Sequence, residues 1–130
     1  MKKKFSVAWK GSSKPKKQVK YRHQAPLHIK HKMVSAHLSG ELRKKYGKRS
    51  APLRKGDKVK IMRGNYKKKD GKVLDVNLKR TKVFIEGFQV SKIDGTKSNI
   101  PFAPSNLMIV DLNLDDKERK KSIEVKQNAP

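Results

Sequence analysis

The sequence has no cysteine, few aromatic residues and few acids. Of its 130 residues, 6% are aromatic and 11 are Asp or Glu. Without cysteine there is no disulfide framework, no thiolate zinc site and no thiol nucleophile. No apolar run approaches the roughly 18 residues that a membrane-spanning helix needs. The apolar stretch after the basic start is also too short for an export signal. We therefore expect a soluble, cytoplasmic protein with no membrane partner.

Positive charge is what the sequence has in excess. It holds 35 Lys and Arg, which gives a formal net charge of +24. Such an excess destabilises a compact chain by self-repulsion unless a polyanion neutralises it. Nucleic acid is the expected partner, and an anionic membrane surface is the rival. The apolar fraction of 34% allows one small core, so we expect a single domain with tails.

The charge is unevenly distributed along the chain. Residues 1–54 carry +16, residues 55–110 carry +8 and residues 111–130 are neutral, while Val, Ile and Leu are concentrated in the middle segment. This predicts a basic N-terminal arm (1–54), a folded domain (55–110) and a mixed-charge C-terminal tail (111–130). A solvated tail is favoured, and a surface helix with charge pairs is the alternative. The arm is expected to become ordered on a partner, with Pro15 and Pro26 dividing it into extended pieces.

One segment of the arm, near residues 35–46, is predicted to form a short helix. Its apolar residues recur every four positions: Val34, Leu38, Leu42 and Tyr46. Ser35 or Ser39 is placed to cap the start of this helix, and Gly47 marks its end. Gly40 lies inside the pattern and leaves two short turns as an alternative.

The middle segment has the pattern of an all-β domain. Short alternating apolar runs, separated by glycine and other turn residues, predict five strands at residues 57–63, 72–77, 82–86, 88–93 and 106–110. The stretch between the last two is expected to be irregular. Because five short strands form no stable open sheet of this size, a small closed barrel is the expected fold.

A lysine-rich loop joins the first two predicted strands. Gly64 and Gly71 frame three consecutive lysines, Lys67 to Lys69. Gly71 is expected to supply a positive φ that other residues resist. The loop would then present its ammonium groups to phosphates from a rigid base.

The segment from Arg54 to Val73 resembles a KOW motif, which is found in small SH3-like barrels that bind RNA. The motif's parts are a Gly-Asp pair before a strand, a basic loop, and a glycine followed by Lys-Val. Flanking runs extend the resemblance, among them Ala25-Pro26-Leu27-His28, Ser35-Ala-His-Leu-Ser39 and Pro104-Ser-Asn-Leu-Met-Ile109. Together they resemble the archaeal and eukaryotic type of a large-subunit ribosomal protein, the family numbered twenty-four in bacteria and twenty-six in eukaryotes. Where loops of that family often have a glycine, this chain has Lys68.

The resemblance implies a structural, non-enzymatic role in the large subunit of the cytoplasmic ribosome. It implies direct binding to ribosomal RNA near the five-prime end of the large rRNA, early action in subunit assembly, and a position near the exit of the polypeptide tunnel. The implied partners are this RNA and neighbouring large-subunit ribosomal proteins. No cofactor and no homo-oligomer are expected.

The candidate RNA-binding residues come from the arm, from the first two predicted strands with the lysine-rich loop between them, and from the turn after the second strand. With +24 to neutralise, we expect about two-thirds of the basic residues before Lys72 to contact phosphate. The candidates are Lys14, Lys16, Lys17, His28, Lys30, His31, Lys32, His37, Arg49, Arg54, Lys55, Lys58, Arg63, Asn65, Lys67, Lys68, Lys69, Lys72 and Arg80.

Histidine and aromatic residues have competing interpretations. His28 and His31 are three residues apart, but without cysteine and with few carboxylates nearby we expect RNA contact and no metal site. Trp9, Tyr21 and Tyr66 are candidates for stacking on unpaired bases, with a place in a barrel loop as an equal alternative for Tyr66.

Two other functional classes compete with the ribosomal interpretation. A KOW-type transcription elongation or DNA-organising factor would be expected to carry a further globular domain or a dimer interface. The highly charged arm provides neither. A membrane-active cationic peptide would need a sustained amphipathic stripe, which the basic segments lack. No spaced set of nucleophile, base and acid suggests catalysis.

Overall fold

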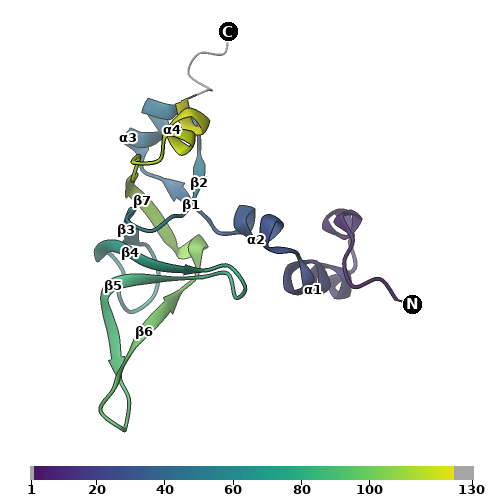
Figure 1. Cartoon of the computed structure of the whole chain (residues 1–130), viewed down its shortest axis with the longest axis horizontal. Coiled ribbons are helices and arrows are strands. Elements are labelled where there is room, and N and C mark those ends of the chain that lie inside the picture. Colours follow the sequence, from purple (N-terminus) through teal and green to yellow (C-terminus); the bar gives the residue numbers. More distant parts are fainter. Residues whose placement is uncertain (1, 125–130) are drawn as a thin grey trace.

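The computed structural model describes residues 2–124, which form a helical arm followed by a sheet domain (Figure 1). The arm begins with a 3₁₀ helix, η1 (Val7–Gly11), and continues with α1 (Pro15–Gln24) and α2 (Leu27–Met33). Pro15 lies at the first position of α1 and Pro26 is the N-cap of α2. The prolines therefore divide the arm as expected, but its pieces are helical rather than extended, because proline favours the first turn of a helix.

The sheet domain contains seven strands in the order β2-β1-β7-β3-β4-β5-β6. The strands are β1 (Ser35–Leu38), β2 (Ser50–Pro52), β3 (Lys58–Ile61), β4 (Asp70–Asn77), β5 (Lys82–Ser91), β6 (Lys97–Phe102) and β7 (Leu107–Asp111). Three helices accompany them: α3 (Gly40–Tyr46), η2 (Pro104–Asn106) and α4 (Lys117–Glu124). The all-β prediction is not confirmed, because the described chain combines a mixed sheet with four α-helices.

The sheet bends at β4, which is shared between two groups of strands. Its first residues, Asp70 to Lys72, pair with β3, and its later residues, Val73 to Asn77, pair with β5. The bend lets both groups cover one core, made by Val59, Ile61, Val73, Val83, Ile85, Phe88, Phe102, Leu107 and Ile109. Within residues 2–124 no pairing joins the end strands β2 and β6, so hydrogen bonds do not close the sheet.

The predicted strands 57–63, 72–77 and 106–110 correspond to β3, β4 and β7. The predicted strands 82–86 and 88–93 are one strand, β5, which changes register between Phe84 and Gln89 and has a positive φ of 89° at Gly87. Its partner β6 occupies the stretch that was expected to be irregular. The β5–β6 hairpin projects away from the rest of the sheet (Figure 1).

Residues 34–53 belong to the folded core, although the sequence placed them in the arm. Ser35–Leu38 is the strand β1, paired with β2 and, in parallel, with β7, and only Gly40–Tyr46 is helical. A spacing of four residues keeps side chains on one face of a strand as well as of a helix, so Val34 and Leu38 fit both. The predicted caps are confirmed: Ser39 accepts the Leu42 N–H, and Gly47 ends α3 with a φ of 62°.

The tail is held to the domain by a buried ion pair. Arg119 of α4 is 6% exposed and its guanidinium donates to both carboxylate oxygens of Asp57, at 2.6 and 2.7 Å, while Asp57 is fully buried. The same carboxylate accepts the backbone N–H groups of Arg54 and Asn113. The alternative for the tail, a surface helix with charge pairs, therefore describes residues 112–124 better than a solvated tail: α4 is anchored by Arg119, and Ile123 joins the core. Residues 125–130 of the predicted tail lie outside the described residues.

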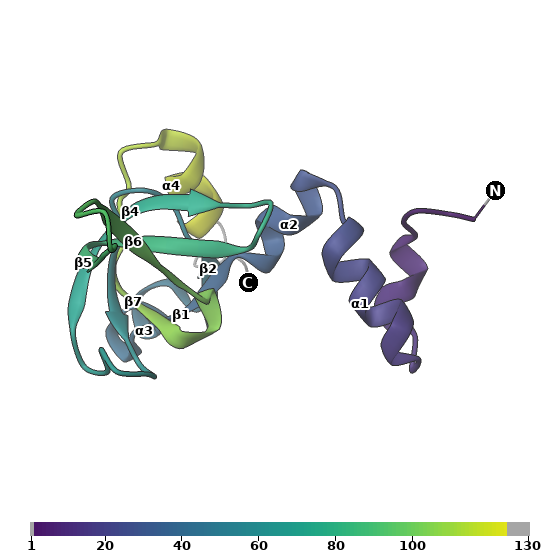
Figure 2. The same ribbon diagram turned by 90° about the horizontal axis from the view of Figure 1, so that it is seen from below.

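The arm projects to one side of this domain, and Figure 2 shows the same separation from a second direction. No residue of α1 is buried, and Val19 and Leu27 are exposed. The distal part of the arm is held by its own contacts, since Phe5 stacks on Tyr21 at 5.4 Å and Gln18 donates to three carbonyls of η1 and its end.

Candidate nucleic-acid interface

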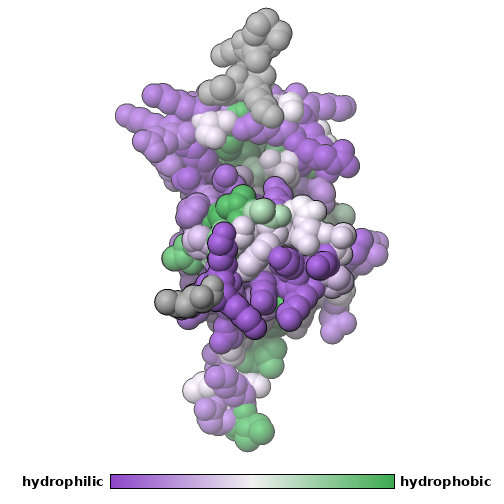
Figure 3. Space-filling model, turned by 90° about the vertical axis from the view of Figure 1, so that its right-hand side faces the viewer, coloured by the Kyte–Doolittle hydropathy of each residue, from purple (hydrophilic) through white to green (hydrophobic). Residues whose placement is uncertain are grey.

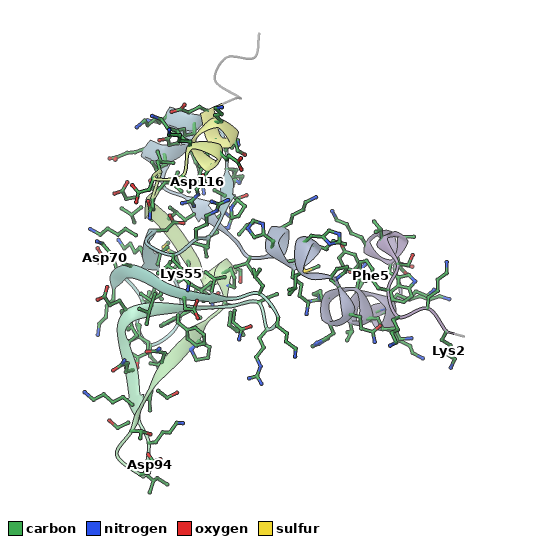
Figure 4. The ribbon with its side chains drawn as sticks, viewed as in Figure 1. Lys2, Phe5, Lys55, Asp70, Asp94 and Asp116 are labelled. Carbon is green, nitrogen blue, oxygen red and sulfur yellow. The ribbon has the colours of Figure 1, made fainter. Side chains whose placement is uncertain are left out.

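Most of the positive charge in the fold has no acidic partner. Within residues 2–124 there are four ion pairs: Arg54–Asp116, Lys55–Asp75, Lys58–Asp70 and Arg119–Asp57. The first acid in the sequence is Glu41, so the whole helical arm lacks one. The acids labelled in Figure 4 accordingly lie on the sheet domain and its tail, away from the arm that carries Lys2. Figure 3 shows that hydrophilic side chains dominate the face on the arm's side.

The predicted RNA-binding residues are, with two exceptions, exposed. The arm contributes Lys14, Lys16, Lys17, His28 and Lys32, the residues around β1 and β2 contribute His37, Arg49 and Arg54, and the sheet and its loops contribute Lys55, Lys58, Arg63, Asn65, Lys67, Lys68, Lys69, Lys72 and Arg80. His31 is half-buried and Lys30 is buried. These residues occupy several surfaces, and no single cleft brings them together.

Three of the exposed candidates are already paired with carboxylates. The side-chain hydrogen bond from Arg54 holds the pKa of Asp116 below its usual value, and the bond from Lys55 does the same for the pKa of Asp75. Lys58 lies 3.8 Å from Asp70. Such exposed pairs stabilise a fold little and are screened by salt, so they compete only weakly with phosphate.

Lys30 joins the arm to the sheet domain. It is 6% exposed, and its Nζ donates to the carbonyl of His23 at 3.1 Å and to that of Lys79, in the β4–β5 turn, at 2.8 Å. The prediction that Lys30 contacts phosphate is therefore wrong in this conformation. Its charge instead fixes the position of α2 beside the turn.

A cavity of about 620 Å³ lies at this junction, and we call it the junction cavity. It is lined by the arm, the first residue of β1, the β4–β5 turn with the start of β5, and the stretch around η2. Its basic lining residues are Arg22, His23, Lys30, Lys79, Arg80 and Lys82, and no acid lines it. Four of these residues, Arg22, His23, Lys79 and Lys82, were not among those predicted from the sequence, although the Lys79-Arg80 pair in a turn between strands was an available signal.

The lysine-rich loop between β3 and β4 folds back on the sheet. The Lys68 N–H donates to the Ile61 carbonyl and the Ile61 N–H donates to the Lys69 carbonyl, each at 2.8 Å. Tyr66 is half-buried and packs edge-on against the core residue Phe88 at 5.1 Å, which favours the alternative of a place in the barrel loop over base stacking. Lys67, Lys68 and Lys69 remain exposed on this anchored loop.

One of the two framing glycines, Gly71, has a different role from that expected. Gly64 has a positive φ of 99°, but Gly71 does not; it lies in β4 where a Cβ would approach Ile85 Cγ2 to 2.7 Å and the Glu86 carbonyl to 3.1 Å. Gly71 is thus needed for the close approach of β5. The second positive φ of the loop, 72°, falls on Lys68.

Replacing Lys68 by glycine should stabilise the fold, because a side chain in the left-handed region costs about 1–2 kcal/mol. Lys67→Gly removes the same charge from the same loop and should destabilise, since glycine adds entropy to the unfolded chain. In urea unfolding, the free energy of unfolding of Lys68→Gly should exceed that of Lys67→Gly by about 1–2 kcal/mol. Equal stabilities of the two variants would show that Lys68 is not strained.

The half-buried His31 lines a second cavity, of about 310 Å³, in which Lys48, Arg54 and Arg119 outnumber the single acid Glu118. Across residues 2–124, no three His, Asp or Glu side chains gather closely enough to hold a metal ion.

None of the described helices is both long and apolar enough to cross a membrane.

Comparison with known proteins assigns the chain to a family. Residues 12–126 match the family described as ribosomal proteins L26 of eukaryotes and L24 of archaea. The chain is 46% identical over 115 residues to the large ribosomal subunit protein uL24 of Korarchaeum cryptofilum, covering 88% of each chain. It is 48% identical over 115 residues to the uL24 of Methanocella arvoryzae, covering 88% of this chain and 93% of that one. The chain therefore belongs to this family of eukaryotic L26 and archaeal L24 proteins and is a structural, non-enzymatic protein of the large ribosomal subunit.

Proposed function

We propose that this chain binds large-subunit ribosomal RNA directly, through the helical arm, the junction cavity and the lysine-rich loop. The observation that carries the proposal is the unneutralised charge: only four ion pairs form in the described chain, and the arm contains no acid. RNA phosphates would neutralise these cations and release their counterions. The anchored loop and the fixed arm present them with little further loss of entropy.

The structure supports different roles for the sheet domain and the arm. The bent arrangement of β3 to β7 supports the SH3-like barrel that the KOW motif implies, and the arm stands off the barrel where it could follow RNA grooves. Residues 34–54 are then part of the barrel unit rather than of the arm. With the resemblance to the family, this arrangement supports action early in subunit assembly, beside neighbouring ribosomal proteins near the tunnel exit of cytoplasmic ribosomes.

A high-salt wash of large subunits tests this proposal. Salt strips proteins held only by loose surface charge, whereas a chain whose arm lies between RNA helices should stay bound. We expect this chain to sediment with the subunit after a wash that removes an added basic protein of similar charge. Its complete release while other subunit proteins remain would contradict the proposal.

A further inference from the structure

The junction cavity has two kinds of wall. Its rim is basic, with Lys79 and Arg80 exposed in the β4–β5 turn. Behind the rim lie the half-buried Met33 and the buried Pro104, and hydroxyls such as that of Ser105 also line it. A site for phosphate alone would need only the rim. The combination of cations with an apolar wall matches a ligand that is anionic at one end and flat and apolar at the other.

The size of the cavity also fits a ligand larger than a single phosphate. Its volume of about 620 Å³ lies within the range of roughly 300–1,000 Å³ typical of small-molecule sites. A single phosphate would leave most of it unfilled. A nucleotide offers a phosphate for the lysines and arginines, and a base that can stack on an arginine plane or rest on apolar side chains.

The cavity is formed before any ligand arrives. Lys30 is buried between its two sides and holds the His23 and Lys79 carbonyls together. Because no acid lines the cavity, no carboxylate competes with an incoming phosphate. A preformed site of this kind binds without the entropic cost of ordering the arm.

We propose that the junction cavity binds one unpaired nucleotide of the RNA, with its phosphate at Lys79 and Arg80 and its base against Met33 and Pro104. This inference rests on the proposed function and adds to it: the arm and the barrel would grip an extruded base between them. RNA recognition of this kind reads single-stranded or bulged positions, whose bases are free to leave the stack.

The test is a titration of the full-length protein, followed by amide NMR spectra at about 0.15 M salt. The probes are adenosine 5′-monophosphate and ribose 5-phosphate, which carry the same phosphate and differ in the base. Stacking of a base contributes about 1–3 kcal/mol, so the nucleotide should bind at least about 5-fold more tightly. Its shifts should concentrate on Ser35, Thr81, Ala103 and Ser105.

Two variants and one matched control locate the site. Ser105→Trp fills the cavity without changing its charge and should abolish the difference between the two probes. Lys79→Glu should weaken both probes several-fold. Lys92→Glu makes the same charge change at an exposed lysine of the β5–β6 turn and should leave the affinity for both probes unchanged. Unchanged amide spectra elsewhere show that each variant is folded.

Equal affinities for the two probes, shifts spread evenly over the basic surface, or full binding by Ser105→Trp would each overturn the inference. The titration and the salt wash can fail separately, so failure of the inference is distinguishable from failure of the proposed function. If the cavity binds no nucleotide but the chain stays on salt-washed subunits, only the further inference fails. If the chain leaves the subunits, the proposed function fails whatever the cavity binds.

Discussion

Replacing Arg119 by methionine should lower the free energy of unfolding by about 3–5 kcal/mol, because it leaves the buried Asp57 carboxylate without its partner. Asp57 is fully buried and receives both guanidinium hydrogen bonds. Arg119 also donates to the carbonyls of Asn113 and Pro52, so the substitution frees the tail and β2 together. Urea unfolding followed by circular dichroism measures the loss.

Two further variants separate charge from packing. The control is Arg54→Met, which makes the same substitution at an exposed arginine that pairs with Asp116. Because exposed ion pairs stabilise little, the free energy of unfolding should hardly change. The double variant Asp57→Leu, Arg119→Met leaves no buried charge unpaired and should recover part of the loss. Recovery should be incomplete, because the backbone N–H groups of Arg54 and Asn113 then lose their acceptor. A small effect of Arg119→Met, no larger than that of Arg54→Met, would show that the tail does not depend on this pair.

Removing residues 1–32 should lower the affinity for a structured fragment of large-subunit rRNA at least about 100-fold at physiological salt. The deleted segment holds 11 Lys and Arg and no acid. Each lost phosphate contact lowers the slope of log affinity against log salt by about 0.7–0.9, so the slope should fall by several units. Fluorescence anisotropy across a series of salt concentrations measures both quantities. The shortened chain begins at Met33 and needs no added residue.

The shortened chain should nevertheless fold. The core cluster begins at Val34, and among the described residues 2–32 the deletion removes only two buried ones, Ala25 and Lys30. Its free energy of unfolding should therefore stay close to that of the full chain. Loss of the cooperative unfolding transition would show instead that the arm is part of the fold, and the affinity comparison would then have to be made with charge substitutions on α1.

Elements of strong local pattern could be predicted from the sequence. The alternation around Val59 and Ile61 gave β3, the run from Leu107 to Ile109 gave β7, and the serine cap and glycine end of α3 were placed correctly. Each depends on a few adjacent residues, so local rules suffice. The resemblance to the family also followed from local runs of residues, and the comparisons confirm it over most of the chain.

Features that depend on distant partners could not be predicted. Nothing near Arg119 in the sequence shows that it meets Asp57, 62 positions away. From the sequence, Lys30 looks like an exposed residue of the arm. It is buried, and its Nζ donates to the carbonyl of Lys79, 49 positions away. The four-residue spacing of Val34 and Leu38 fits helix and strand equally, and only pairing with β7 decides between them.

The candidate interface was predictable as a set of residue types but not as a shape. The arm's lysines and the loop of Lys67 to Lys69 were found because charge density is visible in a sequence. The junction cavity was not found, because it exists only where α2 meets the β4–β5 turn. Arg22 and Lys82 belong to it although neither was singled out by the sequence.

The salt dependence of affinity for structured rRNA and for duplex DNA, measured side by side on the full chain, tests the central claim most directly. Phosphate attraction alone favours neither nucleic acid strongly, whereas groove shape and 2′-hydroxyl contacts favour RNA. We expect tighter binding to the rRNA fragment at every salt concentration, with an advantage that persists at high salt. Equal affinities, or tighter binding to DNA, would contradict the claim that this chain is built to bind ribosomal RNA.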